Sequence, residues 1–228
     1  MDQILDKIDA VLFDLDGTLI DTAPDMVAIL TRLQVAHGLD PLPYETARAY
    51  ISNGALALIR IAFPDALKPE ISKLHREYLE RYEDSVCIKS QIFPHLPELL
   101  DNLDEQNCPW GIVTNKPKRL TDPLLATLGL TNRLSCAISG DTLPQRKPDP
   151  APLLLGCQQT GTAPNRTIYV GDSSRDIEAG RAAEMITIAA AFGYIVPGDD
   201  PISWNSNVIA FSTEELAKIL LKAVNLET

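Results

Sequence analysis

From residue 94 to the end of the chain, short apolar stretches alternate with segments of helical periodicity. The apolar stretches are residues 110–115, 136–139, 167–171, 186–190 and 207–211, and the helical segments are residues 95–106, 118–128, 150–160, 174–183 and 213–224. Nearly continuous apolar strands joined by helices are typical of a parallel sheet that is buried on both faces. The pattern therefore predicts a doubly wound, Rossmann-like α/β domain.

An earlier apolar stretch comes before a long region that carries only helical periodicity. The amphipathic segments of that region are residues 21–37, 45–51, 55–63 and 69–82, and no convincing strand is found among them. Asp21 or Thr22 is a candidate N-cap for the first segment. We therefore expect a core domain formed by residues 1–19 and 86–228, with residues 20–85 inserted as a helical cap domain.

The charge balance argues against nucleic acid or an anionic membrane as a partner. The 228 residues include 31 acidic and 20 basic side chains, so the chain has a net charge of −11 and repels phosphodiesters and anionic lipids. Positive charge for binding a small anion must then be concentrated at a few positions. The candidates are Lys116, Lys118, Arg119, Arg146 and Lys147.

The cysteines and the amino terminus indicate a cytoplasmic protein with reduced thiols. The four cysteines are widely spaced and include no Cys-x-x-Cys pair, which argues against a zinc site. The amino terminus lacks a basic patch followed by an apolar run and a cleavage site, and no apolar stretch approaches the ~20 residues that span a membrane. We expect a monomer or a homodimer.

Polar side chains follow three of the apolar stretches, at the positions where parallel strands present their carboxyl ends to a ligand. They are Asp14 and Asp16, Thr114 and Asn115, and Asp172 and Asp176, with Lys147 in a loop that precedes a helix. Each of them alone can be explained as a helix cap, a first-turn acid or a solvated charge. Their convergence at one edge of the sheet favours a common site.

Asp14 and Asp16 are separated by one residue at the end of a buried strand, residues 10–13, so their side chains are expected to project on the same side. Carboxylates this close repel each other unless a cation lies between them, and such oxygen ligands are those that Mg²⁺ prefers. Gly17 directly afterwards allows backbone amides to approach an anion closely. The stretch is therefore a candidate Mg²⁺ and phosphate site, with an N-capping aspartate and a turn as the alternative.

Four segments resemble, in order and with suitable spacing, the four motifs of the haloacid dehalogenase-like hydrolase superfamily. They are Asp14-Leu15-Asp16-Gly17-Thr18, Thr114-Asn115, Lys147-Pro148 and Gly171-Asp172-Ser173-Ser174-Arg175-Asp176. Over nearly its whole length, the sequence also resembles the phosphoglycolate phosphatase family. This resemblance implies a mobile cap inserted between the first and second motifs.

The resemblance also implies how these residues hydrolyse a phosphate monoester. Asp14 would be the nucleophile that forms an aspartyl-phosphate, and Asp16 would act as general acid and then general base. Thr114, Asn115 and Lys147 would bind the phosphoryl oxygens.

The implied cofactor is Mg²⁺. By resemblance it would be held by the Asp14 side chain, the backbone carbonyl of Asp16, Asp172 and, through water, Asp176. The cation would shield Asp14 from the charge of the phosphate.

The substrate depends on the cap, because the four motifs handle only phosphate and metal. Arg48 and the Ser52-Asn53-Gly54 loop resemble a cap segment of phosphoglycolate phosphatases, and Arg48 and Asn53 are the candidates for contact with the leaving group. The alternative is that Arg48 is solvated and that Gly54 merely starts a helix. Residues 51–63, 110–117 and 193–195, together with Trp204, are also similar to bacterial N-acetylmuramic acid 6-phosphate phosphatases. We therefore expect phosphoglycolate to be the substrate, narrowly ahead of N-acetylmuramic acid 6-phosphate as the second candidate.

The most specific expectation is a Mg²⁺-dependent phosphomonoesterase that acts on a small phosphorylated metabolite. Asp16 separates this chain from the dehalogenases, which lack the second aspartate, and from the cation-pumping ATPases, which have threonine there. Sugar phosphomutases share all four motifs and remain an alternative. A non-catalytic module that binds a phosphorylated metabolite is the alternative of a different class, because a fold alone does not guarantee activity.

Overall fold

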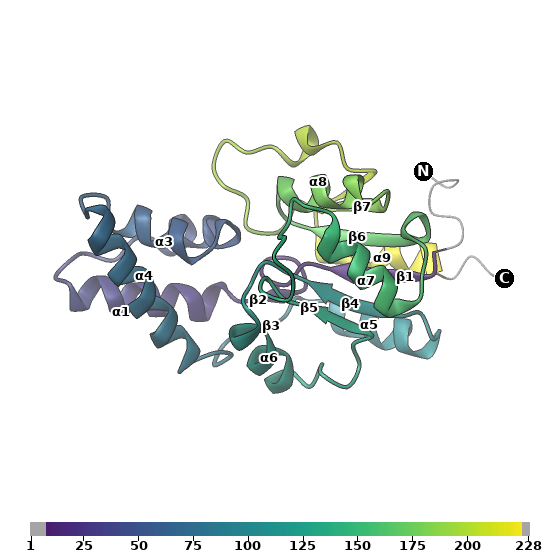
Figure 1. Cartoon of the computed structure of the whole chain (residues 1–228), viewed down its shortest axis with the longest axis horizontal. Helices are drawn as coiled ribbons and strands as arrows, with labels where there is room; N and C mark the ends of the chain where they lie inside the picture. Colours follow the sequence, from purple (N-terminus) through teal and green to yellow (C-terminus); the bar gives the residue numbers. More distant parts are fainter. Residues whose placement is uncertain (1–7, 225–228) are drawn as a thin grey trace.

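The computed structural model describes residues 8–224, which form a sheet core with a helical cap beside it (Figure 1). Within these residues the main sheet has six strands in the order β5-β4-β1-β6-β7-β8, and each neighbouring pair is parallel. The strands are β1 (Ala10–Phe13), β4 (Trp110–Val113), β5 (Cys136–Ile138), β6 (Thr167–Gly171), β7 (Ile186–Ala190) and β8 (Val208–Ala210). The prediction of a doubly wound parallel sheet is confirmed.

The direction in which strands are added to the sheet reverses at β1. The chain moves outward from β1 through β4 to β5, then crosses to β6 and continues through β7 to β8. Val11 is aligned with Trp110 of β4 and with Ile168 of β6, so the carboxyl ends of these strands lie at a similar level. A crevice at such a reversal is where ligands bind in sheets of this kind.

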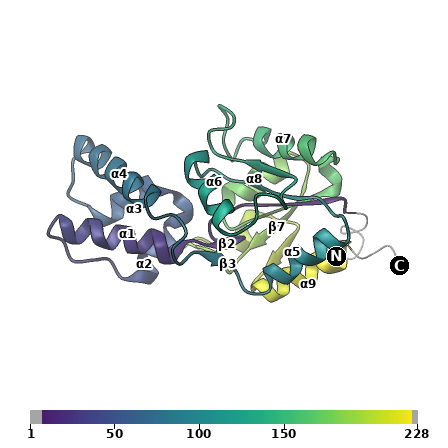
Figure 2. The same cartoon turned by 90° about the horizontal axis from the view of Figure 1, so that it is seen from below.

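Helices cover both faces of the sheet, which explains why its central strands are apolar throughout. The helices are α5 (Leu96–Glu105), α6 (Lys118–Thr127), α7 (Ala151–Thr160), α8 (Ser174–Ala182) and α9 (Thr213–Val224). Leu12 shares a buried cluster with side chains of α7 and α8, whereas Val11 and Phe13 share one with α5 and α9 on the opposite face (Figure 2). The alternation follows from the strand geometry, in which successive side chains point to opposite faces.

The cap is a helical bundle that lies beyond the sheet at one end of the molecule (Figure 1). Its elements are α1 (Ala23–Ala36), α2 (Tyr44–Ala49), the 3-10 turn η1 (Ile51–Asn53), α3 (Ala55–Ala62) and α4 (Lys68–Glu83). Leu30 and Leu33 of α1, Leu58 of α3 and Tyr78 of α4 are buried in one cluster. The region is helical as expected, and the domain boundaries at residues 19/20 and 85/86 stay a prediction.

One short strand lies in the region for which the sequence predicts none. β2 (Ile20–Asp21) pairs antiparallel with β3 (Gln91–Ile92), so the chain enters and leaves the cap through a shared ribbon. A two-residue strand is too short to show an alternating pattern, and its partner is distant in the sequence. Local periodicity therefore gives no sign of it.

Elsewhere the differences from the predicted elements are confined to their ends. β4 ends at Val113, and Thr114 and Asn115 belong to the turn that follows. Thr22 occupies the N-cap position of α1 but does not cap it, because its hydroxyl donates instead to Asp16 Oδ1 at 2.6 Å. Two further 3-10 turns are η2 (Pro164–Arg166) and η3 (Pro201–Trp204). Between residues 8 and 224, no helix has the length and apolar character needed to cross a membrane.

Candidate active site

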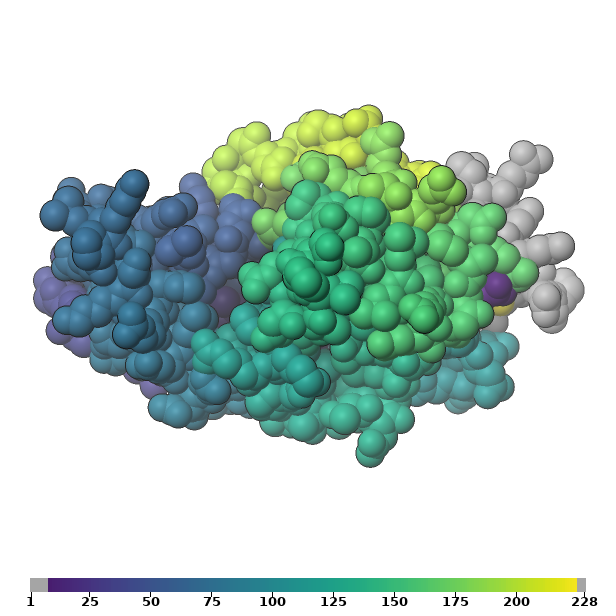
Figure 3. Space-filling view, viewed as in Figure 1, coloured from purple at the N-terminus to yellow at the C-terminus, as the bar shows by residue number. Residues whose placement is uncertain are grey.

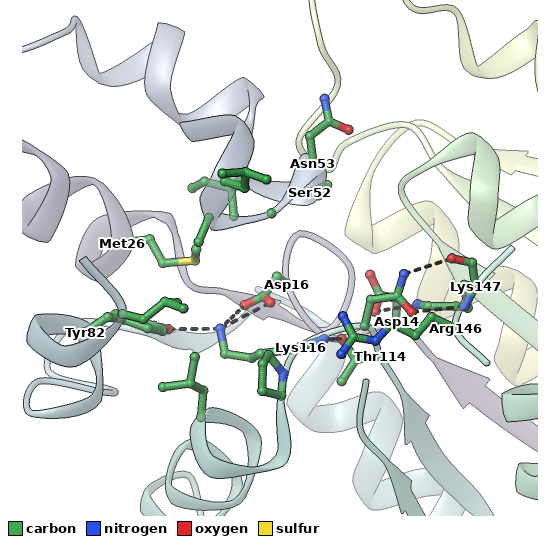
Figure 4. Close-up of a pocket in the computed structure, with 18 of the residues that line it drawn as sticks. Asp14, Asp16, Met26, Ser52, Asn53, Tyr82, Thr114, Lys116, Arg146 and Lys147 are labelled. Atoms are coloured by element: carbon green, nitrogen blue, oxygen red, sulfur yellow. Dashed lines mark hydrogen bonds and ion pairs between the residues drawn. The ribbon is translucent and has the colours of Figure 1, made fainter. Parts of the chain in front are cut away.

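A cavity of about 360 Å³ lies between the carboxyl ends of the core strands and the cap. The space-filling view shows the cap (blue) against the core (green), with the surface hollowed between them (Figure 3). The core side is formed in part by Asp14, Asp16, Thr114, Asn115 and Lys147, all of which the sequence predicts to be site residues (Figure 4). The parallel register explains their convergence, since β1 and β4 end at the same edge.

Lys147 is buried at the centre of the site, with its side chain 1 % exposed. Its Nζ lies 2.8 Å from Asp14 Oδ1 and 2.7 Å from Asp176 Oδ1, and it also donates to Val113 O at 2.9 Å. Burial alone would lower the pKa of Lys147, but the neighbouring Asp14 and Asp176 carboxylates raise it overall. The ammonium therefore stays charged and holds both carboxylates.

Asn115 positions the loop that carries Lys147. Its Oδ1 accepts a hydrogen bond from Lys147 N at 3.1 Å, and its Nδ2 donates to Lys147 O at 3.0 Å. Because both ends of the amide contact the loop backbone, Asn115 acts as a structural link between β4 and that loop. Its expected contact with the phosphate stays a prediction.

Carboxylate oxygens of Asp14, Asp172 and Asp176 lie within 4.8 Å of one another. Burial, followed by the charges of Asp14 and Asp176, raises the pKa of Asp172 well above its ordinary value. Burial is also the main cause of the raised pKa of Asp176, which Lys147 partly offsets. The cluster is therefore costly to ionise without a further positive charge.

The cluster fits a divalent cation. Asp172 Oδ1 and Asp176 Oδ2 are buried and have no hydrogen-bond partner among the residues that the structure describes. Buried polar atoms without a partner are uncommon, and hard oxygen donors of this kind suit Mg²⁺. The Asp16 carboxylate is directed to Lys116 instead, so any contribution of Asp16 to the metal would come from its backbone carbonyl, as the resemblance implies.

Asp16 is held by side chains from both parts of the molecule. Lys116 Nζ lies 2.9 Å from Asp16 Oδ1 and 3.2 Å from Oδ2, and it also donates to Tyr82 OH of α4 at 3.1 Å (Figure 4). Thr22 donates to the same Oδ1 at 2.6 Å. Burial would lower the pKa of Lys116, but the Asp16 carboxylate raises it overall. A charged lysine thus links the core carboxylate to the cap.

Thr114 is buried and lines the cavity directly after β4. Its Oγ1 accepts a hydrogen bond from Lys116 N at 3.2 Å, which leaves the hydroxyl hydrogen available for an anionic oxygen. This geometry is compatible with the predicted phosphate contact.

The two cap residues predicted to contact the leaving group lie in different places. Asn53 lines the cavity. Arg48 does not: its guanidinium stacks 4.7 Å from the centre of the Tyr194 ring and donates to Gly193 O at 3.3 Å. Ser52, the residue before Asn53, contacts a core carboxylate: its hydroxyl donates a hydrogen bond to Asp172 Oδ2 at 2.7 Å.

Sequence reasoning missed the hydrogen-bonding roles of Thr22, Ser52, Tyr82 and Tyr169. Tyr169 OH lies 2.7 Å from Lys147 Nζ and donates to Val113 O at 2.8 Å. Ser52, Tyr82 and Tyr169 are close to the site only through long-range packing, and tyrosines within apolar segments read as ordinary core residues. Thr22 is only six residues from Asp16 and is interpreted from the sequence as a candidate helix cap. For Lys116, the partner of Tyr82, the sequence carries a partial signal, because Lys116 is among the candidate positions for the positive charge of the site.

With this geometry in hand, the family can be identified. Residues 11–190 match the family model described as haloacid dehalogenase-like hydrolase. The chain belongs to this family. This haloacid dehalogenase-like hydrolase is 42% identical over 219 residues to an N-acetylmuramic acid 6-phosphate phosphatase of Pseudomonas aeruginosa, a match that covers 96% of this chain and 97% of the relative. It is 41% identical to a phosphoglycolate phosphatase of Xanthomonas campestris, over 91% of this chain and 94% of the relative.

Solved structures agree with this assignment. A crystal structure named as a predicted phosphoglycolate phosphatase of Haemophilus somnus superimposes with a TM-score of 0.82 at 27% sequence identity, covering 93% of this chain and 98% of that one. Together with the relatives, it shows that this haloacid dehalogenase-like hydrolase is a phosphatase that acts on phosphorylated small molecules.

Proposed function

We propose that this phosphatase hydrolyses a phosphorylated amino sugar that carries a carboxylate, with N-acetylmuramic acid 6-phosphate as the first candidate. The observation that carries the proposal is the size of the cavity with the cap in place, about 360 Å³. Pockets for ligands of drug-like size usually occupy about 300–1,000 Å³. A two-carbon acid such as phosphoglycolate would leave much of this cavity unfilled.

The lining of the cavity also supports a substrate with a large leaving group. On the cap side Met26, Ile51, Leu56 and Leu79 provide an apolar surface, which suits the ring and methyl groups of an acylated sugar. His75 lies there too, and burial lowers its pKa, so the imidazole is neutral near pH 7 and can exchange hydrogen bonds with sugar hydroxyls.

Two arginines of the cavity wall offer charge for a substrate carboxylate. Arg146 and Arg175 line the cavity, and the charge of Arg175 also partly offsets the effect of burial, which raises the pKa of the adjacent Asp176. Arginine binds carboxylates with two parallel hydrogen bonds, which gives both affinity and orientation. In a chain with a net charge of −11, two such guanidinium groups at one cavity support an anionic substrate.

The first chemical step follows from the positions of Asp14 and Asp16. Lys147 binds Asp14 Oδ1, which leaves Oδ2 as the oxygen that attacks the phosphorus. The bond between phosphorus and the ester oxygen breaks, and the leaving alkoxide takes a proton from Asp16, which must enter this step as the neutral acid rather than as the carboxylate that pairs with Lys116. Thr114 donates a hydrogen bond to a phosphoryl oxygen during the transfer, and Lys147 does so by giving up its contact with Asp176 or with Val113 O.

The second step releases phosphate and restores Asp14. A water molecule attacks the phosphorus of the aspartyl-phosphate, Asp16 takes its proton, and the bond between phosphorus and Asp14 breaks. Bound at Asp14, Asp172, Asp176 and the backbone carbonyl of Asp16, Mg²⁺ would supply positive charge that reduces the repulsion between the carboxylate nucleophile and the phosphate.

The proposal is tested by comparing kcat/KM for N-acetylmuramic acid 6-phosphate, N-acetylglucosamine 6-phosphate, phosphoglycolate and p-nitrophenyl phosphate, each with and without Mg²⁺. The first two differ only in the carboxylate-bearing ether, so their ratio measures recognition of the carboxylate. We expect the N-acetylmuramic acid ester to be preferred over N-acetylglucosamine 6-phosphate by at least about tenfold, since an ionic hydrogen-bonded contact contributes about 1.5–3 kcal/mol. It should also be preferred over phosphoglycolate, because its larger leaving group fills more of the cavity.

Phosphoglycolate is the second candidate, supported by the relatives of that name. A higher kcat/KM for phosphoglycolate would overturn the amino-sugar assignment. Conversion of β-glucose 1-phosphate into a sugar phosphate would identify a mutase. Turnover no higher than that of Asp14→Asn on every ester would identify a binding module, and turnover independent of Mg²⁺ would refute the metal assignment.

A further inference from the structure

The cap supplies a hydrogen bond to one of the clustered core carboxylates. Asp172 Oδ2 accepts a hydrogen bond from Tyr194 N at 2.8 Å and another from Ser52 Oγ at 2.7 Å. Tyr194 belongs to the core, whereas Ser52 lies in η1 of the cap. The other oxygen, Oδ1, is buried and has no partner within residues 8–224. One oxygen of Asp172 is thus fixed by the core and the cap together, and the second is left for another ligand.

The backbone around Asp172 confines its carboxylate. A Cβ atom at Gly17 would collide with Asp172 Oδ2, and one at Gly193 would collide with Asp172 Cβ. The side chain therefore lies between the main chains of two glycines. Within this narrow space the hydrogen bonds to Oδ2 determine which way Oδ1 faces.

A second cap contact holds the same core loop. The Arg48 guanidinium stacks on the Tyr194 ring at 4.7 Å and donates to Gly193 O at 3.3 Å and to Phe192 O at 3.5 Å. Arg48 and Ser52 thus both bind the segment around Asp172, and both contacts require the cap to lie against the core. When the cap moves away, Asp172 Oδ2 keeps only the hydrogen bond from Tyr194 N.

We propose that Ser52 is a positioning residue that couples closure of the cap to the affinity of the Asp14–Asp172–Asp176 cluster for a divalent cation. Hydrogen bonds that orient a metal ligand typically change metal affinity by about 10–100-fold. Because Ser52 reaches Asp172 only from the closed cap, the cation binds the closed form more tightly. By linkage, the bound cation must then favour closure by the same factor.

The inference rests on the proposed role of Asp172 as a metal ligand, and the experiment separates the two. Isothermal titration of the full-length, substrate-free protein with Mg²⁺ gives the dissociation constant without any measurement of activity. We expect Ser52→Ala to weaken Mg²⁺ binding about tenfold, and Ser52→Thr, which keeps the hydroxyl, to restore most of the affinity.

Ser72→Ala is the matched control, because Ser72 is an exposed cap serine whose hydroxyl donates to Lys68 O in its own helix at 3.1 Å. It should leave the dissociation constant unchanged. If Asp172→Asn abolishes binding while Ser52→Ala binds as the wild type does, the role of Ser52 is refuted and the metal site stands. If Asp172→Asn also binds normally, the metal site itself is refuted.

Small-angle scattering tests the reciprocal effect. We expect Mg²⁺ to lower the radius of gyration of the wild type, and Ser52→Ala to need about tenfold more Mg²⁺ for the same change. A wild-type radius that does not respond to Mg²⁺, or equal responses of the two proteins, would overturn the coupling. Tighter Mg²⁺ binding by Ser52→Ala would show that the hydroxyl competes with the cation and would also overturn it.

Discussion

Lys147 places one ammonium group between Asp14 and Asp176, where its side chain is 1 % exposed. A buried charge pair contributes little net stability when it is complete, because forming it desolvates both groups. Removing one partner is much more costly, since the remaining charges are left buried without compensation. The residue should therefore matter to folding as well as to catalysis.

We expect Lys147→Met to lower kcat for p-nitrophenyl phosphate by at least about a hundredfold, because a donor to the transferred phosphoryl group is lost. The free energy of unfolding should fall by about 3–5 kcal/mol at neutral pH, as measured by urea denaturation. Lys118→Met is the matched control, since Lys118 is exposed and, among residues 8–224, forms its ion pair with exposed Asp122. A Lys147 variant with kcat within tenfold of the wild type would contradict the proposed contact.

At this scale, the sequence predicts where residues that directly follow strands lie, while their roles stay predictions. The structure brings Asp14 and Thr114 to one cavity because parallel strands deliver their carboxyl ends to one edge, and Lys147 joins them from the loop that precedes α7. Thr22, which with Asp21 was one of two candidate caps for α1, binds Asp16 instead. A threonine hydroxyl at this position can cap the helix or bind a nearby side chain, and the local sequence favours neither. The position of the turn at Asp16 therefore decides which of the two hydrogen bonds forms.

Helix α4 contributes to the site through Tyr82, whose hydroxyl accepts a hydrogen bond from Lys116 Nζ at 3.1 Å. Lys116 in turn binds Asp16 at 2.9 Å, so a cap helix and a core loop hold one ammonium group in common. Tyr78, one turn earlier in α4, donates to Met26 O inside the cap at 3.1 Å. The two buried tyrosines therefore differ in whether their hydroxyl reaches the core.

We predict that Tyr82→Phe and Lys116→Met are coupled, because both remove the same contact. A double-mutant cycle on the free energy of unfolding should give an interaction energy of about 0.5–3 kcal/mol. Tyr78→Phe combined with Lys116→Met is the matched control and should be additive within about 0.5 kcal/mol. Additivity in both cycles would mean that the Tyr82 hydroxyl does not hold Lys116 in solution.

The elements themselves followed from periodicity to within a residue or two at their ends. β6, β7 and α9 have the predicted bounds, because each is a complete apolar or amphipathic stretch with clear breaks. β4 stops two residues early, since Thr114 and Asn115 form hydrogen bonds with the following turn and with the Lys147 loop. The local β-propensity of residues 114 and 115 carries no information about these tertiary hydrogen-bond partners.

The stability of the whole molecule should depend on protons and on a cation through the same carboxylates. Burial raises the pKa of Asp172 and of Asp176 in the folded protein. Both groups therefore bind protons more tightly in the folded than in the unfolded chain. Their contribution to stability is present at low pH and is lost as the pH rises through the raised pKa values.

A cation bound at this cluster should restore the stability that is lost when Asp172 and Asp176 release their protons, because its positive charge takes the place of those protons. We expect Mg²⁺ at about a hundred times its dissociation constant to raise the melting temperature by about 5–10 °C near pH 8. Near pH 5.5 the rise should be smaller, since protons then compete for the carboxylates. Calorimetry with Asp172→Asn as the control measures both effects, and a rise that is equal at the two pH values would contradict this account.

The closed placement of the cap could not be read from the sequence. The switch from helical periodicity to strand–helix alternation predicted a helical insertion and its approximate extent. The contacts that seat it, such as Ser52 with Asp172 and Arg48 with Tyr194, join residues more than a hundred positions apart. No local pattern encodes such pairs. The sequence singles out Asp172 and Arg48 as candidate site residues, but it does not indicate that Ser52 and Tyr194 are their partners.

The ribbon formed by β2 and β3 fixes where the chain leaves the core and where it returns. Ile20 is paired with Ile92, so the two crossing points are neighbours at about the 4.8 Å spacing of adjacent strands. Insertions whose ends lie this close together are well tolerated, because the host fold does not have to stretch to accept them. A helical segment with adjacent ends can therefore be inserted at this position without stretching β1. The ribbon makes the insertion geometrically modular, whereas the contacts of Ser52 with Asp172 and of Tyr82 with Lys116 tie the present cap to the core carboxylates.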